Sequence, residues 1–292
     1  MKQIYIAGCG YTGKRIALQA AAKGYKLIAQ IRNEERAKEL ADCGIQTICA
    51  AVDQLDEIPF LPCADSCLLY SIPPQGGGNI DLRLRNFLAA LERDQQLPAR
   101  IIYLGASSVY GDTGGAVVNE DSLTAPTSAM GKRRLDAEDQ LHAFAEKHRI
   151  ALVILRISAI YGAGRLPLMQ ISQGQPLLRE EEAKLSNRIH VDDLVQVCLA
   201  AVEHGSGIYN VSDGSPGSMT SYFNCCADAL ELPRQPQITM AEAQKVMPPL
   251  LFNYFVESRV VDNGKMLHEF NIKLHYPDMQ SGVKASIMAG KG

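Results

Sequence analysis

Glycines near the N-terminus have the spacing of a loop that can hold an anion. They follow the apolar run Ile4–Ala7 directly, and residues 14–17 continue as a helix. At such a strand–helix junction, the first glycine permits a tight turn, the second lets a pyrophosphate approach, and the third lets helix and strand pack closely. Amides at the helix start would bind the phosphates. The spacing predicts a dinucleotide site formed by Gly8, Gly10, Tyr11, Thr12 and Gly13.

The end of the second apolar run bears on the choice of dinucleotide. In an NAD site an acidic residue there holds the ribose hydroxyls. Here the run ends in Arg32, and no acid occurs before Glu34. A guanidinium suits a 2′-phosphate, so we expect NADP as the preferred cofactor and leave NAD open. Asp53, after the third apolar run, either accepts a hydrogen bond from the adenine amino group or closes a turn.

Strands and helices alternate through the first half of the chain, which is typical of a parallel sheet with helices on both faces. The fold class is therefore α/β, with a doubly wound parallel sheet. After Tyr161 the alternation loosens, apart from a helix over 192–203 and a strand over 207–211. We predict a nucleotide-binding domain over 1–160 and a smaller C-terminal lobe over 161–292 that partly completes the sheet, with a ligand cleft between them. The earlier expected strands are 4–7, 25–31, 45–52, 66–72, 100–104 and 151–156, and the helices are 12–23, 34–42, 80–93 and 130–148.

Composition narrows the class of protein. The 29 basic and 32 acidic residues give a net charge of −3, so no field would attract nucleic acid or an anionic membrane surface. No apolar run is long enough to span a membrane. The first strand leaves no room for a signal peptide, so a cytoplasmic protein is expected. The eight cysteines form no CxxC pair and have no histidine cluster beside them, so we expect reduced thiols and no metal site.

Further motifs extend over most of the chain. They are Gly8–Gly13, Asp53, residues 107–111 (Ser-Ser-Val-Tyr-Gly), 156–165, 188–194 and 207–211, and Tyr276-Pro277. In this order they resemble the extended short-chain dehydrogenase/reductases, the NAD(P)-dependent epimerase/dehydratase family. The resemblance implies a Rossmann domain, a C-terminal substrate lobe and a small-molecule substrate that is often a nucleotide-sugar. It also implies a homodimer formed through two helices of each subunit.

Catalysis in the resembling family uses a Ser or Thr, a Tyr, and a Lys four residues after the Tyr. In the family's register these positions fall on Ala106, Met130 and Arg134. A thioether transfers no proton, and a guanidinium can bind a ribose hydroxyl but does not titrate. The standard chemistry is therefore expected to be lost, with Ser108 or an acid on the substrate replacing the missing hydroxyl. A Ser128–Lys132 pair is a less favoured alternative.

The resemblance also places substrate contacts in two later segments. Arg165 and Arg188 belong to segments that border the substrate diphosphate in the family, and Tyr110 either stacks or packs. Because a guanidinium offers a planar fork to phosphate oxygens, an anionic ligand is expected at Arg188 with Arg165 nearby. Internal ion pairs with residues 180–182 are the alternative. Two functions stay open: an oxidoreductase or epimerase acting on an anionic small molecule, and a non-catalytic NADP-binding sensor or scaffold.

Overall fold

The computed structural model describes residues 3–247, 252, 255 and 257–290. The chain divides into two compact units, each built from several segments. The first unit comprises Met1–Val109, Pro126–Arg156 and Val195–Tyr209, and the second comprises Tyr110–Ala125, Ile157–Leu194 and Asn210–Gly292. The predicted division of roles at residue 160 stays a prediction, because these units describe packing rather than binding.

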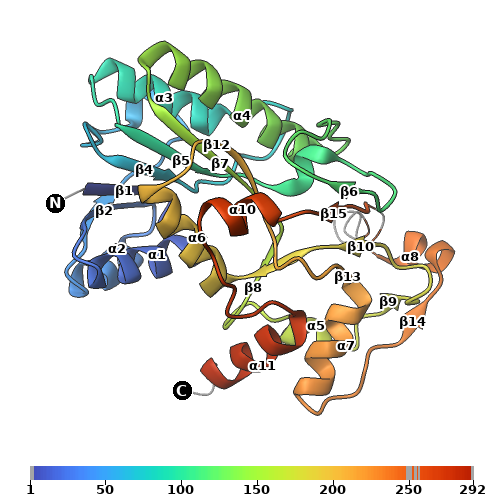
Figure 1. Ribbon diagram of the computed structural model, residues 1–292. Helices are drawn as coiled ribbons and strands as arrows, with labels where there is room; N and C mark the ends of the chain where they lie inside the picture. The colour runs from blue at the N-terminus through green and yellow to red at the C-terminus, as the bar shows by residue number, and fades with distance from the viewer. Residues whose placement is uncertain (1–2, 248–251, 253–254, 256, 291–292) are drawn as a thin grey trace. The chain divides into compact units, whose positions relative to one another are not determined.

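A seven-stranded sheet forms the frame of the first unit (Figure 1). Its strands pair in parallel from β3 through β2, β1, β4 and β5 to β7, and β12 lies beside β7. The predicted α/β fold with a doubly wound parallel sheet is confirmed. The strands are β1 (Gln3–Ala7), β2 (Lys26–Ile31), β3 (Gln46–Cys49), β4 (Cys67–Tyr70), β5 (Arg100–Leu104), β7 (Ala151–Ile157) and β12 (Gly207–Val211).

The order of the strands reverses beside β1, which pairs with β2 on one side and β4 on the other. In open α/β sheets this reversal leaves a crevice at the carboxyl ends of the strands, where ligands bind. The segment that follows Ala7 therefore starts at the position where a ligand is expected. Two predicted strands were too long: β3 ends at Cys49 rather than Val52, and β4 at Tyr70 rather than Ile72.

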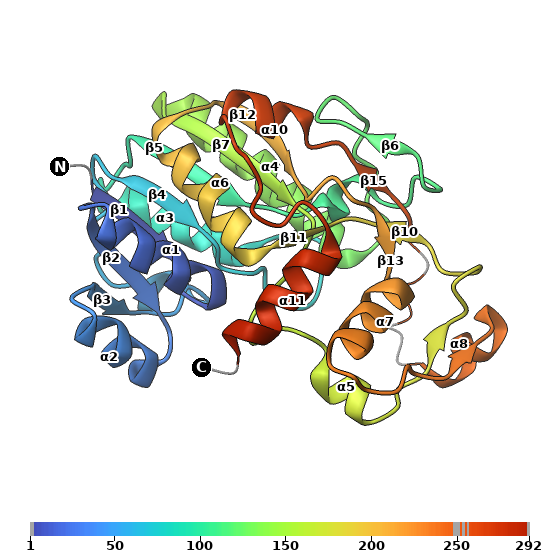
Figure 2. The same ribbon diagram turned by 60° about the horizontal axis from the view of Figure 1, so that its bottom comes forward.

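Helices cover both faces of this sheet, with α3 and α4 on one face and α1 and α2 on the other (Figures 1 and 2). Side chains that precede three of them accept an amide hydrogen bond from the first turn: Asn33 from Arg36, Asp81 from Leu84, and Ser128 from Gly131. Such caps satisfy amides that have no partner within the helix. The helices are α1 (Tyr11–Ala22), α2 (Glu34–Asp42), α3 (Leu82–Arg93), α4 (Ala129–His148) and α6 (Val191–Glu203).

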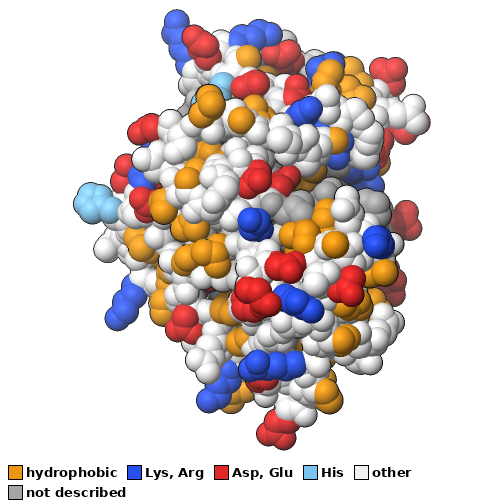
Figure 3. Space-filling model, turned by 90° about the vertical axis from the view of Figure 1, so that its right-hand side faces the viewer, with side chains coloured by type: hydrophobic (Ala, Val, Ile, Leu, Met, Phe, Trp, Pro, Cys, Tyr) orange, Lys and Arg blue, Asp and Glu red, His pale blue; other side chains and the backbone are white. Residues whose placement is uncertain are grey.

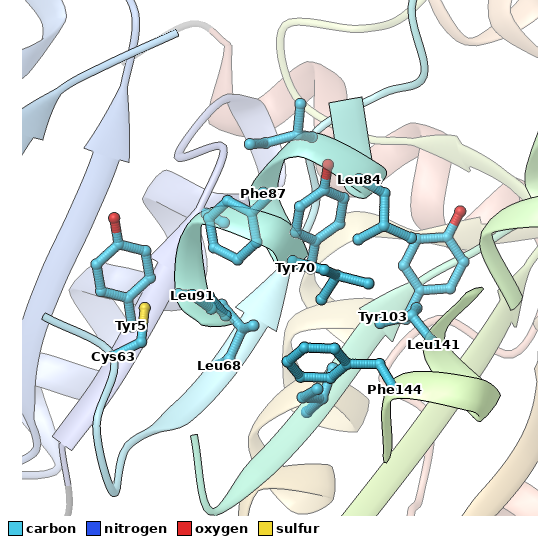
Figure 4. Packing of buried hydrophobic residues seen from close by; sticks show 14 of the residues in the cluster. Tyr5, Cys63, Leu68, Tyr70, Leu84, Phe87, Leu91, Tyr103, Leu141 and Phe144 are labelled. Atoms are coloured by element: carbon cyan, nitrogen blue, oxygen red, sulfur yellow. The ribbon is translucent and has the colours of Figure 1, made fainter. Parts of the chain in front are cut away.

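A large apolar core joins the sheet to α3 and α4 (Figure 4). Tyr70 and Phe87 pack edge to face with ring centroids 5.2 Å apart, and Tyr103 lies 6.2 Å from Tyr70. Each fully buried large side chain stabilises the fold by about 1.5–3 kcal/mol. The core holds the carboxyl ends of β4 and β5 in fixed positions, and these ends support the candidate site.

The second unit consists of short two-stranded ladders and helices around a smaller core. Helices α7 and α11 pack against each other (Figure 2), and a Cβ on Gly282 of α11 would overlap the Tyr161 hydroxyl. The paired strands are β8 (Ala159–Tyr161) with β11 (Arg188–His190), β9 (Leu177–Leu178) with β14 (Gln237–Ile238), β10 (Leu185–Ser186) with β13 (Gly217–Ser218), and β6 (Val117–Val118) with β15 (Val260–Val261). The helices are α5 (Leu168–Ser172), α7 (Met219–Ala229), α8 (Met240–Val246), α10 (Gly264–Glu269) and α11 (Met279–Ala289).

Candidate cofactor and substrate sites

The three glycines of the loop between β1 and α1 have different surroundings. Gly8 has a φ of +86°, and a Cβ there would lie 2.8 Å from the Ile72 side chain. A Cβ on Gly13 would lie 3.1 Å from the Gly8 carbonyl oxygen, whereas a Cβ on Gly10 would meet nothing within 4 Å. The chain's own conformation and packing therefore require glycine at position 8, and they leave little room for a side chain at position 13. The space at Gly10 is open to a ligand.

A cavity of about 220 Å³ opens beside this loop. Three guanidinium groups line it: one from the β2–α2 connection, one from the first turn of α2 and one from the first turn of α3. Its walls are therefore basic at the place where β2 ends. The lining residues are Gly8, Cys9, Gly10, Gln30, Ile31, Arg32, Asn33, Arg36, Val52, Ile72, Pro73 and Arg83.

Asp53 lies between two of these guanidiniums. Its Oδ1 is 2.7 Å from Arg83 Nε, and its Oδ2 is 4.0 Å from Arg32 Nη1. The Arg32 side chain is 61 % exposed, whereas that of Arg83 is only 16 % exposed. Three arginines line the cavity, whereas its described lining includes no carboxylate, and Asp53 beside it pairs with Arg83. The balance at this wall favours an anionic group on the ligand.

Sequence reasoning missed Arg36 and Arg83. Arg36 could have been found, because it lies in the first turn of the helix that Asn33 caps and so close to the end of β2. Arg83 had no such local signal, because its position depends on how α3 packs. The two cations that follow the glycine loop have partners within the protein: Lys14 pairs with Glu39 at 2.9 Å, and the Arg15 guanidinium lies 3.9 Å from the centre of the Tyr11 ring.

The serines that follow β5 do not continue the strand. β5 ends at Leu104, and Ser107–Tyr110 form a turn of 3₁₀-helix, so the two serines do not alternate between the faces of a sheet. Ser107 is buried, and the Ser108 hydroxyl oxygen is buried without a hydrogen-bond partner among the described residues. Ala106, at the family's serine position, offers no hydroxyl.

The start of α4 presses against this turn. A Cβ on Gly131 would lie 2.7 Å from the Ser108 carbonyl oxygen, so only glycine permits the contact. Met130 is 45 % exposed. Arg134 donates from Nη1 to both the Tyr103 hydroxyl and the Leu104 carbonyl, each at 3.1 Å. The structure thus brings the start of α4, with Met130 and Arg134, next to the end of β5, which Ala106 follows.

Ser128, the first residue of the alternative Ser128–Lys132 pair, has a structural role. The Ser128 hydroxyl oxygen accepts the Gly131 amide at 3.2 Å as the cap of α4. Lys132 is exposed one turn later.

The three predicted substrate residues differ in their surroundings. Tyr110 is buried, and its hydroxyl donates to Asn210 Oδ1 at 2.7 Å. Arg188 is only 3 % exposed; its guanidinium donates to the carbonyls of Gly217 and Ser218 at 3.1 Å each. Arg165 lies at the surface in the loop after β8. The structure therefore buries the first two and exposes the third.

The buried Arg188 guanidinium has no carboxylate within 4.0 Å among the described residues. For Arg188, the structure therefore does not show the alternative, an internal ion pair with one of residues 180–182. The Tyr222 ring lies 4.7 Å away, and burial lowers the pKa of this guanidinium. Buried charges are normally paired, so this cation lacks its ordinary compensation.

Asp213 lies beside Arg188 and was missed by sequence reasoning. Its amide donates to the Arg188 carbonyl at 2.7 Å, and its Oδ1 accepts the Ser215 amide at 3.0 Å. The residue is 5 % exposed, and its Oδ2 is buried without a partner in the described structure. Burial raises its pKa to about 7. In the sequence, Ser-Asp-Gly-Ser indicates only a turn, and burial of the carboxyl depends on the tertiary structure.

Among the described residues, no helix is long and apolar enough to cross a bilayer. Nor do their His, Cys, Asp and Glu side chains gather in a group of three that could hold a metal ion.

Comparisons with known proteins agree with this architecture. Protein YeeZ of Escherichia coli K12 is 24% identical over 290 residues, which cover 95% of this chain and 97% of YeeZ. A functionally unknown conserved protein from Silicibacter pomeroyi superposes with a TM-score of 0.82 at 26% identity, with all of both chains covered. A Bacillus cereus UDP-glucuronic acid 4-epimerase in complex with NAD superposes with a TM-score of 0.75 at 18% identity, with 100% and 99% coverage.

A family model decides the assignment. The model described as the NAD dependent epimerase/dehydratase family matches residues 4–212, well over half of the chain. The matched segment contains the glycine loop, the serine turn after β5 and all of the parallel sheet except Gln3. The chain belongs to the NAD dependent epimerase/dehydratase family.

Proposed function

We propose that this protein binds NADP and a small anionic molecule, with the cofactor held by the domain over 1–160 and the substrate by the lobe over 161–292. The observation that carries the first part is the basic cavity beside the glycine loop. Amides of the loop would hold the pyrophosphate, and Arg32, with Arg36 and Arg83 on the same wall, would hold a 2′-phosphate. NAD in the Bacillus cereus neighbour supports a nicotinamide dinucleotide as the cofactor class.

The residues of this site fit a nicotinamide dinucleotide. The open space at Gly10 would admit a pyrophosphate, and Arg134 at the end of β5 would donate to the nicotinamide ribose. When bound, the nicotinamide ring supplies a hydride acceptor or donor. Asp53 accepts from Arg83 through Oδ1, and its Oδ2, 4.0 Å from Arg32 Nη1, would accept a hydrogen bond from the adenine amino group.

Isothermal titration of NADP and NAD tests the cofactor proposal. Loss of one charge-assisted contact costs about 1.5–3 kcal/mol, so Arg32→Asp should weaken NADP binding about ten- to hundredfold. Arg85→Asp is the matched control, because it makes the same charge change on an exposed residue of α3 that does not line the cavity. Gly10→Val should abolish binding of both dinucleotides without a clash inside the protein. Equal or tighter binding of NAD by the unmutated protein would contradict the NADP preference.

We propose further that the standard Ser-Tyr-Lys chemistry is lost. Met130 and Ala106 offer no proton donor, and Arg134 stays protonated at ordinary pH. Two serines follow this end of β5, and we assign the role to Ser108, whose oxygen has no partner among the described residues. It would donate to the reacting oxygen of the substrate. Turnover of common nucleotide-sugars should then fall below the rate of about 1 per second that is typical of enzymes.

The substrate proposal rests on Arg188. Its buried guanidinium has no ion pair among the described residues, and an anionic group on a nucleotide-sugar or related molecule would supply one. Arg165 is the second cation assigned to this ligand. Restoring the family residues with Ala106→Ser, Met130→Tyr and Arg134→Lys should raise turnover of the nucleotide-sugar that binds. Unchanged activity in a folded triple variant that still binds both ligands would contradict the proposal.

A non-catalytic NADP sensor or scaffold is the second candidate function. It is favoured by Arg134, whose guanidinium ties α4 to the end of β5 and so serves a structural purpose at the family's lysine position. This candidate requires tight NADP binding, no turnover in the triple variant, and a change in protease sensitivity when NADP is added. A homodimer and a cytoplasmic location complete the proposal. Light scattering after gel filtration and cell fractionation test them.

A further inference from the structure

Tyr103 is buried in the core of the first unit, yet its hydroxyl oxygen accepts a hydrogen bond from a charged group. The donor is Arg134 Nη1 on α4, at 3.1 Å, and the same nitrogen donates to the Leu104 carbonyl oxygen, also at 3.1 Å. Both acceptors are neutral, and both belong to β5. The guanidinium is therefore tied to the end of β5 through one nitrogen atom.

The other edge of the Arg134 guanidinium has no acceptor within the described part of the chain. Arg134 is half-buried, and neither Nε nor Nη2 is among the fully buried atoms that lack a partner, so this edge is open to solvent. Its N–H groups lie in one plane and form a fixed fork. Such a fork can donate to two neighbouring oxygen atoms at once, and the two hydroxyls of a ribose are such a pair.

The order of the strands brings this edge next to the cofactor cavity. Ile72, which follows β4, lines the cavity beside the glycine loop. β4 pairs with β5, with Tyr70 opposite Tyr103, so β5 is the next strand along the same edge of the sheet. A dinucleotide bound at the glycine loop lies across the carboxyl ends of such strands. The ribose of its nicotinamide half would then meet the open edge of Arg134.

Packing fixes the ring that carries the Tyr103 hydroxyl. Tyr70 and Tyr103 are both fully buried, their ring centroids are 6.2 Å apart, and their hydroxyls point the same way in Figure 4. The two hydroxyls differ in their hydrogen bonds, because that of Tyr70 is buried without a partner among the described residues. Of this pair, only Tyr103 holds an arginine, and Tyr70 is a matched comparison for it.

Holding a cation in place reduces the entropy that is lost when a ligand binds to it. Figure 3 shows basic side chains among acidic ones on one face of the molecule, and such surface cations keep their rotamer freedom until they bind. Arg134 differs from them because a buried hydroxyl fixes one of its nitrogen atoms. We propose that Tyr103 is a positioning residue of the cofactor site, whose hydroxyl holds Arg134 so that Nε and Nη2 donate to both hydroxyls of the nicotinamide ribose. This inference rests on the proposed dinucleotide binding and adds the residue that directs the arginine.

Isothermal titration with NADP and with a fragment of it tests this role. Tyr103→Phe should weaken NADP binding about tenfold, because Arg134 Nη1 loses one of its acceptors. Adenosine 2′,5′-bisphosphate lacks the nicotinamide ribose, so its affinity should stay the same in this variant. Tyr70→Phe is the matched control, since it removes a buried hydroxyl without a partner in the described structure and should leave both affinities unchanged. If NAD binds more tightly than NADP, NAD and ADP are the ligand and the fragment.

A double variant shows whether the effect passes through the arginine. Arg134→Met should weaken dinucleotide binding about tenfold or more, and adding Tyr103→Phe should then weaken it no further. Three results would each overturn the positioning role: unchanged dinucleotide affinity in folded Tyr103→Phe, equal losses for dinucleotide and fragment, or additive losses in the double variant. Absence of binding of either dinucleotide to the unmutated protein would overturn the proposed function as well, so the two failures are distinguishable.

Discussion

Replacing Asp213 with asparagine should stabilise the protein, and more so at high pH than at low pH. The carboxyl is buried beside Arg188, and its pKa rises from an ordinary value of 3.8 to about 7 because burial penalises the charged form. The folded state therefore holds a proton that the unfolded state releases. Stability contributed by this protonated carboxyl is fully present below pH 4 and is lost as the pH rises toward 7.

The gap between 3.8 and about 7 corresponds to at most about 4 kcal/mol in the free energy of unfolding. Asparagine carries no charge and keeps an oxygen that can accept the Ser215 amide. Relative to the unmutated protein, Asp213→Asn should gain little at pH 4 and up to about 4 kcal/mol at pH 8. Urea unfolding across this range measures the difference, with equal m-values as the sign that both proteins unfold alike.

Asp228→Asn is the matched control, because Arg234 lowers the pKa of this exposed carboxyl. Its contribution has the opposite sign: it is present above the unfolded pKa and is lost as the pH falls through the folded pKa. That substitution should slightly destabilise the protein at neutral pH. If the unfolding free energies of Asp213→Asn and the unmutated protein run parallel from pH 4 to 8, Asp213 is not a buried carboxyl with a raised pKa.

Three further measurements check the local geometry. Gly131→Ala should destabilise the protein by about 1–3 kcal/mol, because its Cβ would lie 2.7 Å from the Ser108 carbonyl oxygen; the neighbouring exposed Met130→Ala should cost much less in the same thermal melts. Asn33→Ala should cost about 1 kcal/mol by removing the cap of α2, and in urea unfolding a cost shared by Asn33→Asp would argue against the cap. Burial raises the pKa of the Cys9 thiol to about 12, so mass spectrometry should find exposed Cys43 alkylated long before Cys9 at pH 8.

The elements with signals in their own sequence could be predicted closely. The bounds of α2 follow from Asn33 at its start and a glycine with positive φ shortly after its end. The strands β5 and β12 also have the predicted bounds. The end of β3 was wrong because β3 is an edge strand, and its pairing with β2 stops where β2 stops. That limit is set by a neighbouring strand and is invisible in the residues of β3.

In the candidate site, too, the residues with a local signal could be predicted and those placed by tertiary packing could not. The glycine loop and Arg32 are local features, and each lies where its spacing suggested. Arg83 lines the same cavity from the start of α3, about fifty residues further along the chain, so only tertiary packing reveals it. Asp213 is the opposite case, since its residue type and neighbours indicate an ordinary turn and only burial makes it unusual.

Two buried polar groups in the second unit lack full compensation within the protein, and this favours a ligand there. Arg188 is a buried cation without a carboxylate within 4.0 Å in the described structure, and Asp213 next to it is a buried carboxyl with one unpaired oxygen. Apolar residues of similar size at such positions are often neutral or stabilising. A chain that keeps both groups gives up stability there, as binding and catalytic sites commonly do. We infer that an anionic group bound at Arg188 supplies the missing compensation. In that case the stability gained by Asp213→Asn should be accompanied by a change in affinity for the anionic ligand.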